Sequence, residues 1–210
     1  MEKFEIYELN YWDAITMIPI FLCAFIVNNV WLSYSFIFMG IVGFLHHLFI
    51  NSYRILLLDM FSVSITSIVF TIISQIPQGI KDFIYFIQLF VNIFLLYCFI
   101  LNVRYPNRIL LIIVSLIWLP LVIFSIKYIS HASGFIGLIA IFLYMSSVTL
   151  CNKNPFVRFS WPLMHIIVAI LVFFVLYEMD YLRPEIYKPI ENLLDYIVDI
   201  KENMISKNTK

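Results

Sequence analysis

The chain has 210 residues, of which 63% are hydrophobic and only 12% are charged. Soluble globular domains carry about 25% charged residues, so this composition indicates an integral membrane protein. The formal net charge is zero, so charge gives no reason to expect a nucleic-acid partner.

Seven apolar stretches follow one another along the chain, and each is close to the about 17 to 25 residues that a helix needs to cross a bilayer. They lie at 13–29, 30–50, 55–75, 83–101, 109–127, 134–150 and 159–177. Pro and Asn residues stand at most of the breaks between them, as is typical of turns. The sequence therefore predicts an all-α membrane protein with an N-terminal segment (1–12), a seven-helix transmembrane domain (13–177) and a C-terminal tail (178–210).

Basic residues in the short loops predict the orientation. Six of them fall on the side of the N-terminus: Lys3, Arg54, Arg104, Arg108, Lys153 and Arg158. The other side has two, Lys81 and Lys127. Lys and Arg are enriched in cytoplasmic loops, so we expect a cytoplasmic N-terminus. The first thirteen residues are acidic rather than basic, so we expect the first span to be retained as an anchor rather than cleaved as a signal peptide.

The tail predicts an amphipathic helix from about Pro189. Apolar residues recur there at helical spacing: Ile190, Leu193, Leu194, Ile197 and Met204. Its polar face is acidic, which disfavours binding to anionic lipid. Two roles stay open: a helix lying across the exposed ends of the bundle, or a helix that binds a protein partner or dimerises.

Apart from Asp13 and Lys127 at the ends of their spans, four Asp, Glu, Lys, Arg or His side chains lie inside the predicted spans: His46, His47, Asp59 and His165. Such groups are costly in a bilayer and usually face the bundle interior, where they serve a function. At 1.5 Å per residue, His47, Asp59 and His165 lie about 5, 6 and 9 Å from the cytoplasmic ends of their spans. The three depths agree, so we expect one polar site in the cytoplasmic third of the bundle.

Imidazole nitrogen and carboxylate oxygen are both ligands for zinc. Zinc lowers the pKa of bound water enough to supply hydroxide near neutral pH. In this interpretation His47, His165 and His46 are metal ligands, and Asp59 is the catalytic group that accepts the proton of the water. Adjacent residues of a helix point about 100° apart, so we expect only one of the two neighbouring histidines to face the site well, and we favour His47.

Two other interpretations of these residues stay open. In the first, the histidines are interhelical hydrogen-bond partners, and Asp59 is paired to Arg54. Alternatively, His47 and His165 would be the two axial ligands of a haem. The remaining histidine, His131, falls in a predicted loop on the opposite face, and we expect it to be a solvated loop residue.

Two short stretches resemble a known family: Gly43-Phe44-Leu45-His46-His47 and Leu56-Leu57-Leu58-Asp59-Met60-Phe61-Ser62. They are similar to the CREST superfamily of seven-pass hydrolases, which includes alkaline ceramidases, progestin and adipoQ receptors and GPI-lipid remodelling proteins. The stretch 160–167 falls where that family has an HxxxH motif. The resemblance implies a zinc-dependent enzyme that hydrolyses an amide or ester of a membrane lipid, with one histidine of the adjacent pair, Asp59 and His165 in its site.

The chain departs from the family pattern at two places. Trp161 stands where the first histidine of the HxxxH motif belongs, and Gly43 or Val42 stands where the family has a serine. Either the spare histidine of the pair completes the site, or the protein is a non-catalytic receptor, fusion factor or assembly factor on the same scaffold. The run Glu8-Leu9-Asn10-Tyr11 resembles part of a calcium-binding segment of the ceramidases, which adds calcium as a second expected cofactor.

Overall fold

The computed structural model describes residues 14–49, 52–104, 131–150 and 160–208, and four single residues between 105 and 130. Its helices are α2 (Ile18–Ile26), α3 (Val30–Leu48), α4 (Tyr53–Ile73), α5 (Gln78–Leu101), α7 (His131–Leu150), α8 (Ser160–Glu178) and α9 (Pro184–Asn208). In this part of the chain the only pairing of extended backbone is an isolated bridge between Val27 and Leu182. The predicted all-α class is therefore confirmed for the described residues.

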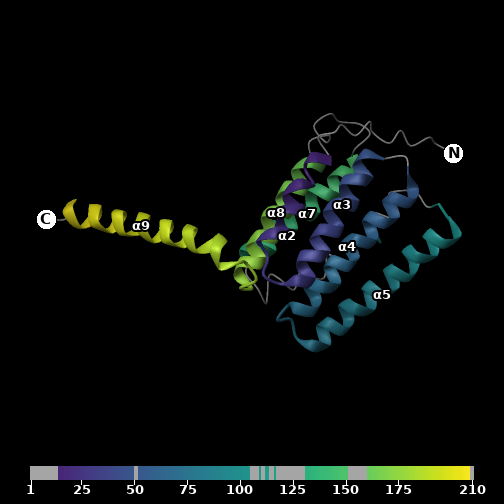
Figure 1. Ribbon diagram of the computed structural model, residues 1–210, viewed down its shortest axis with the longest axis horizontal. Helices are drawn as coiled ribbons and strands as arrows, with labels where there is room; N and C mark the ends of the chain where they lie inside the picture. The colour runs from purple at the N-terminus through teal and green to yellow at the C-terminus, as the bar shows by residue number, and fades with distance from the viewer. Residues whose placement is uncertain are drawn as a thin grey trace.

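The helices pack in a continuous row. α5 contacts α4, α4 contacts α3, α3 contacts α2, α2 contacts α8, and α8 contacts α7. Figure 1 shows α5 at one outer edge of the bundle, whereas α9 extends away from it as a single long helix. Segments from the two ends of the chain, α2 and α8, are thus direct neighbours.

Three of the described helices, α3, α4 and α5, are long and apolar enough to cross a membrane. They contain 19, 21 and 24 residues. Shorter apolar helical stretches lie at Ala132–Leu143 and Pro162–Glu178. The chain is therefore a membrane protein, and three of its described helices meet this length and composition criterion where the sequence predicts seven spans.

The first predicted span, 13–29, is interrupted. Residues 14 and 15 are helical, Thr16 and Met17 form a turn, and α2 begins only at Ile18. Pro19 lies in the first turn of α2. Proline has no backbone N–H and its ring clashes with the preceding turn, so it starts a helix more readily than it continues one. The fifth predicted span, 109–127, lies almost entirely outside the described residues.

The first four predicted breaks between spans are found close to their expected positions where the structure describes them, whereas the sixth, at 152–155, lies outside the described residues. Asn29 caps α3, and its side-chain oxygen accepts hydrogen bonds from the backbone N–H groups of Trp31 and Leu32 at 3.0 and 3.1 Å. Such a cap satisfies donors that the first turn of a helix leaves open. At the end of α5, Asn102 adopts a left-handed conformation with φ of 50°. Local turn chemistry thus sets these boundaries.

The C-terminal helix begins earlier than the sequence predicts. α9 starts at Pro184 and continues through Pro189 to Asn208. A proline inside a helix removes one hydrogen bond to the carbonyl four residues earlier, which here belongs to Glu185. Glu185 is exposed, so water can bind that carbonyl in place of the missing N–H group.

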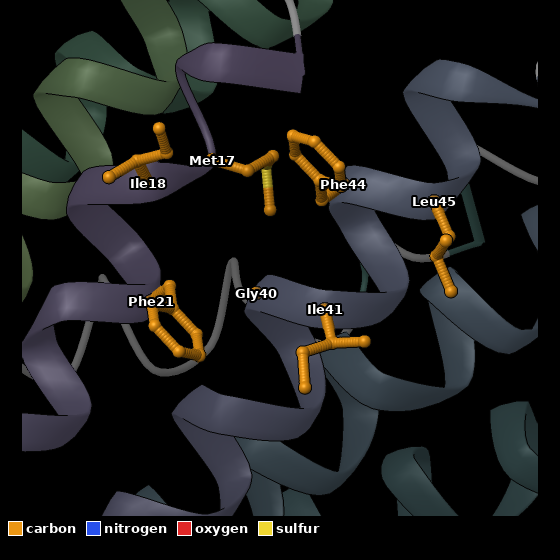
Figure 2. A pocket seen from close by; sticks show the side chains of 7 residues that line it. All are labelled: Met17, Ile18, Phe21, Gly40, Ile41, Phe44 and Leu45. Atoms are coloured by element: carbon orange, nitrogen blue, oxygen red, sulfur yellow. The ribbon is translucent and has the colours of Figure 1, made fainter.

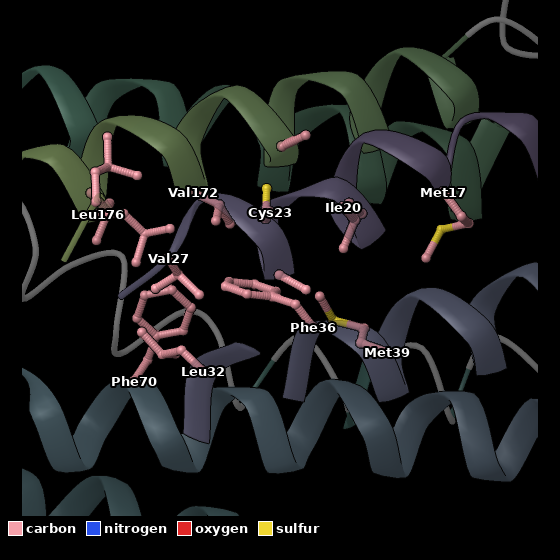
Figure 3. Close-up of a cluster of buried hydrophobic side chains, with 14 residues drawn as sticks. Met17, Ile20, Cys23, Val27, Leu32, Phe36, Met39, Phe70, Val172 and Leu176 are labelled. Atoms are coloured by element: carbon pink, nitrogen blue, oxygen red, sulfur yellow. The ribbon is translucent and has the colours of Figure 1, made fainter. Parts of the chain in front are cut away.

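Buried side chains from α2, α3, α4 and α8 form the larger hydrophobic core. Figure 3 shows this cluster between the helices, with Phe36 and Phe70 packed edge to face at 5.8 Å between ring centroids. Beyond α8, the chain binds the turn between α2 and α3. The N–H of Asn28 donates to Tyr181 O at 2.9 Å, and Arg183 Nε donates to Val27 O at 3.1 Å. The hydrophobic core and these hydrogen bonds hold α2 against α8.

Candidate functional site

The ionisable residues that the sequence places in one site are brought together at one end of the bundle. His46 and His47 lie in the last turn of α3, Asp59 lies within the first two turns of α4, and His165 lies within the first two turns of α8. Because α3 ends where α4 and α8 begin, all four side chains reach the same level. Their side chains form one continuous polar group across three helices.

The closest polar contact in the group joins α3 to α4. Nδ1 of His46 lies 2.8 Å from Oδ2 of Asp59, and the two side chains are 12% and 18% exposed. A carboxylate in its ionised form only accepts hydrogen bonds, so in the pairing of imidazole with carboxylate Nδ1 of His46 is the donor. The lone pair of His46 is then on Nε2, where it is available to a proton or to a metal ion.

The second part of the group joins α3 to α8. The ring of His47 stacks on that of His46 with 5.1 Å between centroids, and it meets the ring of His165 edge-on at 5.2 Å. Both His47 and His165 are buried. Nδ1 of His165 lies 2.9 Å from Oγ1 of Thr16, in the turn that precedes α2. A chain of contacts therefore runs from Asp59 through three imidazoles to Thr16.

Both adjacent histidines contact other members of this group, whereas the sequence analysis expects only one of them to face the site well. The roughly 100° between neighbouring residues directs His46 toward α4 and His47 toward α8, and both helices contribute to the site. The carboxylate of Asp59 pairs with His46 and forms no ion pair with Arg54, although the structure describes both residues.

The second carboxylate oxygen of Asp59 faces α3 beside Gly43. A Cβ atom added to Gly43 would lie 3.3 Å from Oδ1 of Asp59 and 2.3 Å from Cε of Met17. Gly43 therefore leaves space that the end of the Met17 side chain occupies. Any larger residue at 43, including a serine, would first have to displace the end of the Met17 side chain.

The imidazole nitrogens and the carboxylate oxygens of this group are the types of ligand atom that zinc binds. Metal-bound histidines usually hold their second ring nitrogen on an oxygen partner, as His46 does on Asp59 and His165 on Thr16. Two imidazoles on one tetrahedral zinc, each with a Zn–N distance of about 2.0 to 2.1 Å, have ring centres about 5 Å apart. The observed separations of 5.1 and 5.2 Å agree with that value.

In their present orientation, these donor atoms do not form a metal site. Within the described part of the chain, no three His, Cys, Asp or Glu side chains point their donor atoms at a common centre as a metal site needs. The rings of His46 and His47 are nearly parallel, with 23° between their planes. Ligation by both would therefore require at least one ring to turn about its side-chain torsions.

Haem ligation by His47 and His165 does not fit this geometry, because their rings are in direct contact and leave no gap for a porphyrin. Other predicted elements of the site lie outside the description. These are the side chain of Trp161 and the calcium-like segment at 8–11. His131, which the sequence predicts in a loop away from the site, is instead the first residue of α7.

Sequence analysis missed Thr16 and Met17, which the structure places beside His165 and beside Gly43, respectively. Only a weak feature of the sequence points to these two residues. Thr16 is a polar residue three positions before Pro19, and together they mark the interruption of the first span.

The chain matches no family model, and comparisons with curated proteins and with solved structures found nothing similar. The likeness to the CREST superfamily therefore stays a prediction from short motifs.

Proposed function

We propose that this protein is a membrane-embedded, zinc-dependent hydrolase that cleaves an amide or ester bond of a membrane lipid. The observation that carries the proposal is the His46–Asp59 pair at 2.8 Å, with two further histidines packed against it inside a helical membrane domain. Ionisable groups gathered at this depth are a functional site by default, because each one alone would cost free energy in the bilayer.

In this proposal the metal ligands are nitrogens of His46, His47 and His165. A zinc ion there supplies Lewis acidity, which polarises the substrate carbonyl and makes water a stronger acid. Asp59 has two tasks on its two oxygens. Oδ2 accepts the hydrogen bond that holds the His46 ring, and Oδ1 is left to accept a proton from the attacking water. Thr16 is a positioning residue that holds the ring of His165.

The proposal includes a seven-span topology with a cytoplasmic N-terminus, which puts the site near the cytoplasmic face. The six-to-two distribution of Lys and Arg in the short loops supports this orientation. A membrane lipid then reaches the site from the bilayer. The C-terminal helix α9 remains a candidate for binding a protein partner.

A non-catalytic receptor, fusion factor or assembly factor is the second candidate. The observation that favours it is the lack, among the described side chains, of three donors aimed at one centre. His46–Asp59 and His165–Thr16 would then be interhelical hydrogen bonds that stabilise the bundle.

Metal analysis of the purified full chain separates the two candidates. The hydrolase should bind about one zinc per chain and release fatty acid or free amine from a mixed-lipid vesicle. Protein that is folded, contains no stoichiometric metal after zinc loading and leaves every lipid intact would support the non-catalytic scaffold instead.

A further inference from the structure

An apolar cavity of about 230 Å³ lies between α2 and α3, next to the polar site. Its lining residues are Met17, Ile18, Phe21, Gly40, Ile41, Phe44 and Leu45. Figure 2 shows side chains from the two helices facing each other across it. The side chains of Ile18 and Ile41 are 44% and 48% exposed, so the cavity is open at the outer surface of the bundle.

The occupant of such a groove follows from its surroundings. α3 is long and apolar enough to cross a membrane, so its exposed face lies against lipid chains. Among the described residues, no polar side chain lines the cavity, so none of them binds a headgroup or a peptide inside it. Its volume is below the about 300 to 1,000 Å³ of pockets for drug-sized ligands, which suits part of one hydrocarbon chain.

The order of groups along α3 matches the order of groups in a lipid. The adjacent histidines lie one or two residues from the end of α3, whereas Gly40 and Leu45 lie about 12 and 5 Å from it along the axis. A lipid likewise has its amide or ester linkage near the membrane surface and its chain deeper. The polar pair and the groove are therefore at the depths of the linkage and of the chain.

Met17 separates the groove from the polar pair. It lines the cavity, and its Cε atom occupies the space beside Gly43 that faces Oδ1 of Asp59. A methionine side chain is unbranched and flexible, so it can move without disturbing the helices. Displacement of this one side chain would join the groove to the site.

We infer that the groove between α2 and α3 binds one acyl chain of a membrane lipid, whose carbonyl end then lies past Met17 at Asp59. This inference rests on the proposed function in treating the His46–Asp59 pair as the place of cleavage. The groove itself adds the substrate class: a lipid with at least one aliphatic chain, which enters from the bilayer on the α2–α3 side.

The test uses the full chain in vesicles that contain a phosphatidylcholine with a diazirine in the middle of one acyl chain. After illumination, mass spectrometry locates the labelled residues. We expect label concentrated on Phe21, Phe44 and Leu45, and at least a fivefold loss in Ile41→Trp, where the indole fills the groove. Ile93→Trp is the matched control, because Ile93 is 59% exposed on α5 and does not line the groove.

Label spread evenly over the exposed apolar residues of α3 and α5 would overturn the inference. This distribution is measured on the wild-type protein, so the result does not depend on whether a variant folds. Asp59→Asn separates the inference from the proposed function. Label retained in the groove of that variant, with hydrolysis lost, supports both. Groove labelling in a wild-type protein that hydrolyses no lipid would overturn the proposed function and leave the acyl-chain site in place. Lipid hydrolysis together with even labelling would support the proposed function and overturn the acyl-chain site.

Discussion

Nδ1 of His46 and Oδ2 of Asp59 lie 2.8 Å apart and join the last turn of α3 to the start of α4. The contact directs the ring of His46 so that its other nitrogen is left for chemistry. It also leaves Oδ1 of Asp59 on the side of Gly43, where the end of the Met17 side chain lies. One pair of residues thus orients a candidate ligand and presents a candidate base.

Asp59→Asn should lower lipid hydrolysis by about a hundredfold or more while zinc is retained, because an amide cannot accept the proton of the attacking water. Product release from vesicles and zinc content would be measured on the same preparation. Asp82→Asn is the control, since Asp82 is exposed on α5 and bonds only to Gln78 among the contacts found. Equal losses in both variants would remove Asp59 from the mechanism.

His165→Ala should release the zinc, and Thr16→Val should weaken its binding about tenfold. The first variant removes a ligand. The second keeps the size of the side chain and removes only the oxygen that lies 2.9 Å from Nδ1 of His165, and such outer partners affect metal affinity by about 10- to 100-fold. Competition with a chromogenic chelator measures both affinities. Unchanged zinc binding in His165→Ala would show that the metal, if present, is held elsewhere.

Gly40→Ala should be more destabilising than Gly43→Ala, although both changes add one methyl group to the same helix. At Gly40 the new Cβ meets Cβ and Cα of Phe21 at 2.7 and 3.0 Å, so the α2 backbone must move. At Gly43 it meets chiefly the mobile end of Met17. Overpacking costs about 1 to 3 kcal/mol, and we expect a difference of about 1 to 2 kcal/mol in the free energy of unfolding in micelles. Equal values would mean that α2 is not held closely against α3.

Gln88→Leu should lower the free energy of unfolding by only about 1 kcal/mol. Nε2 of Gln88 donates to Ser67 Oγ at 2.7 Å and to Thr71 Oγ1 at 3.2 Å, whereas its buried Oε1 has no hydrogen-bond partner among the residues that the structure describes. Hydrogen bonds between membrane helices contribute on average about 0.6 kcal/mol each, and leucine removes the unsatisfied oxygen as well. Unfolding in mixed micelles measures the change. A loss above about 3 kcal/mol would show that Gln88 binds something more than these two hydroxyls.

Reporter domains fused after Ser52, Tyr105 and Pro155 should all report the cytoplasmic side, because the basic residues of the short loops lie there. A fusion after Gln78 should report the opposite side and serves as the control for the assay. A lumenal or periplasmic signal after Tyr105 would contradict the combination of a cytoplasmic N-terminus with four spans before that residue.

Several features of the fold could be predicted because their causes are local. High apolar content predicts membrane helices, and Asn29 and Asn102 end or begin helices through their own side chains or backbone conformation. The common level of His47, Asp59 and His165 could also be predicted, since helical rise is constant along each span. The interruption at Thr16–Met17 could not, because a proline near the start of an apolar run does not by itself say where the helix begins.

The sequence by itself determined that this is a helical membrane protein and that its ionisable residues gather at one end of the helices. Only the tertiary structure decided what those residues touch. His46 turns to Asp59 and His47 to His165 because α3 packs between α4 on one side and α2 with α8 on the other. Thr16 reaches His165, 149 positions away, because the two ends of the chain pack together. Such contacts depend on the order of helices in space, which hydrophobic periodicity does not specify, since every neighbour offers the same apolar surface.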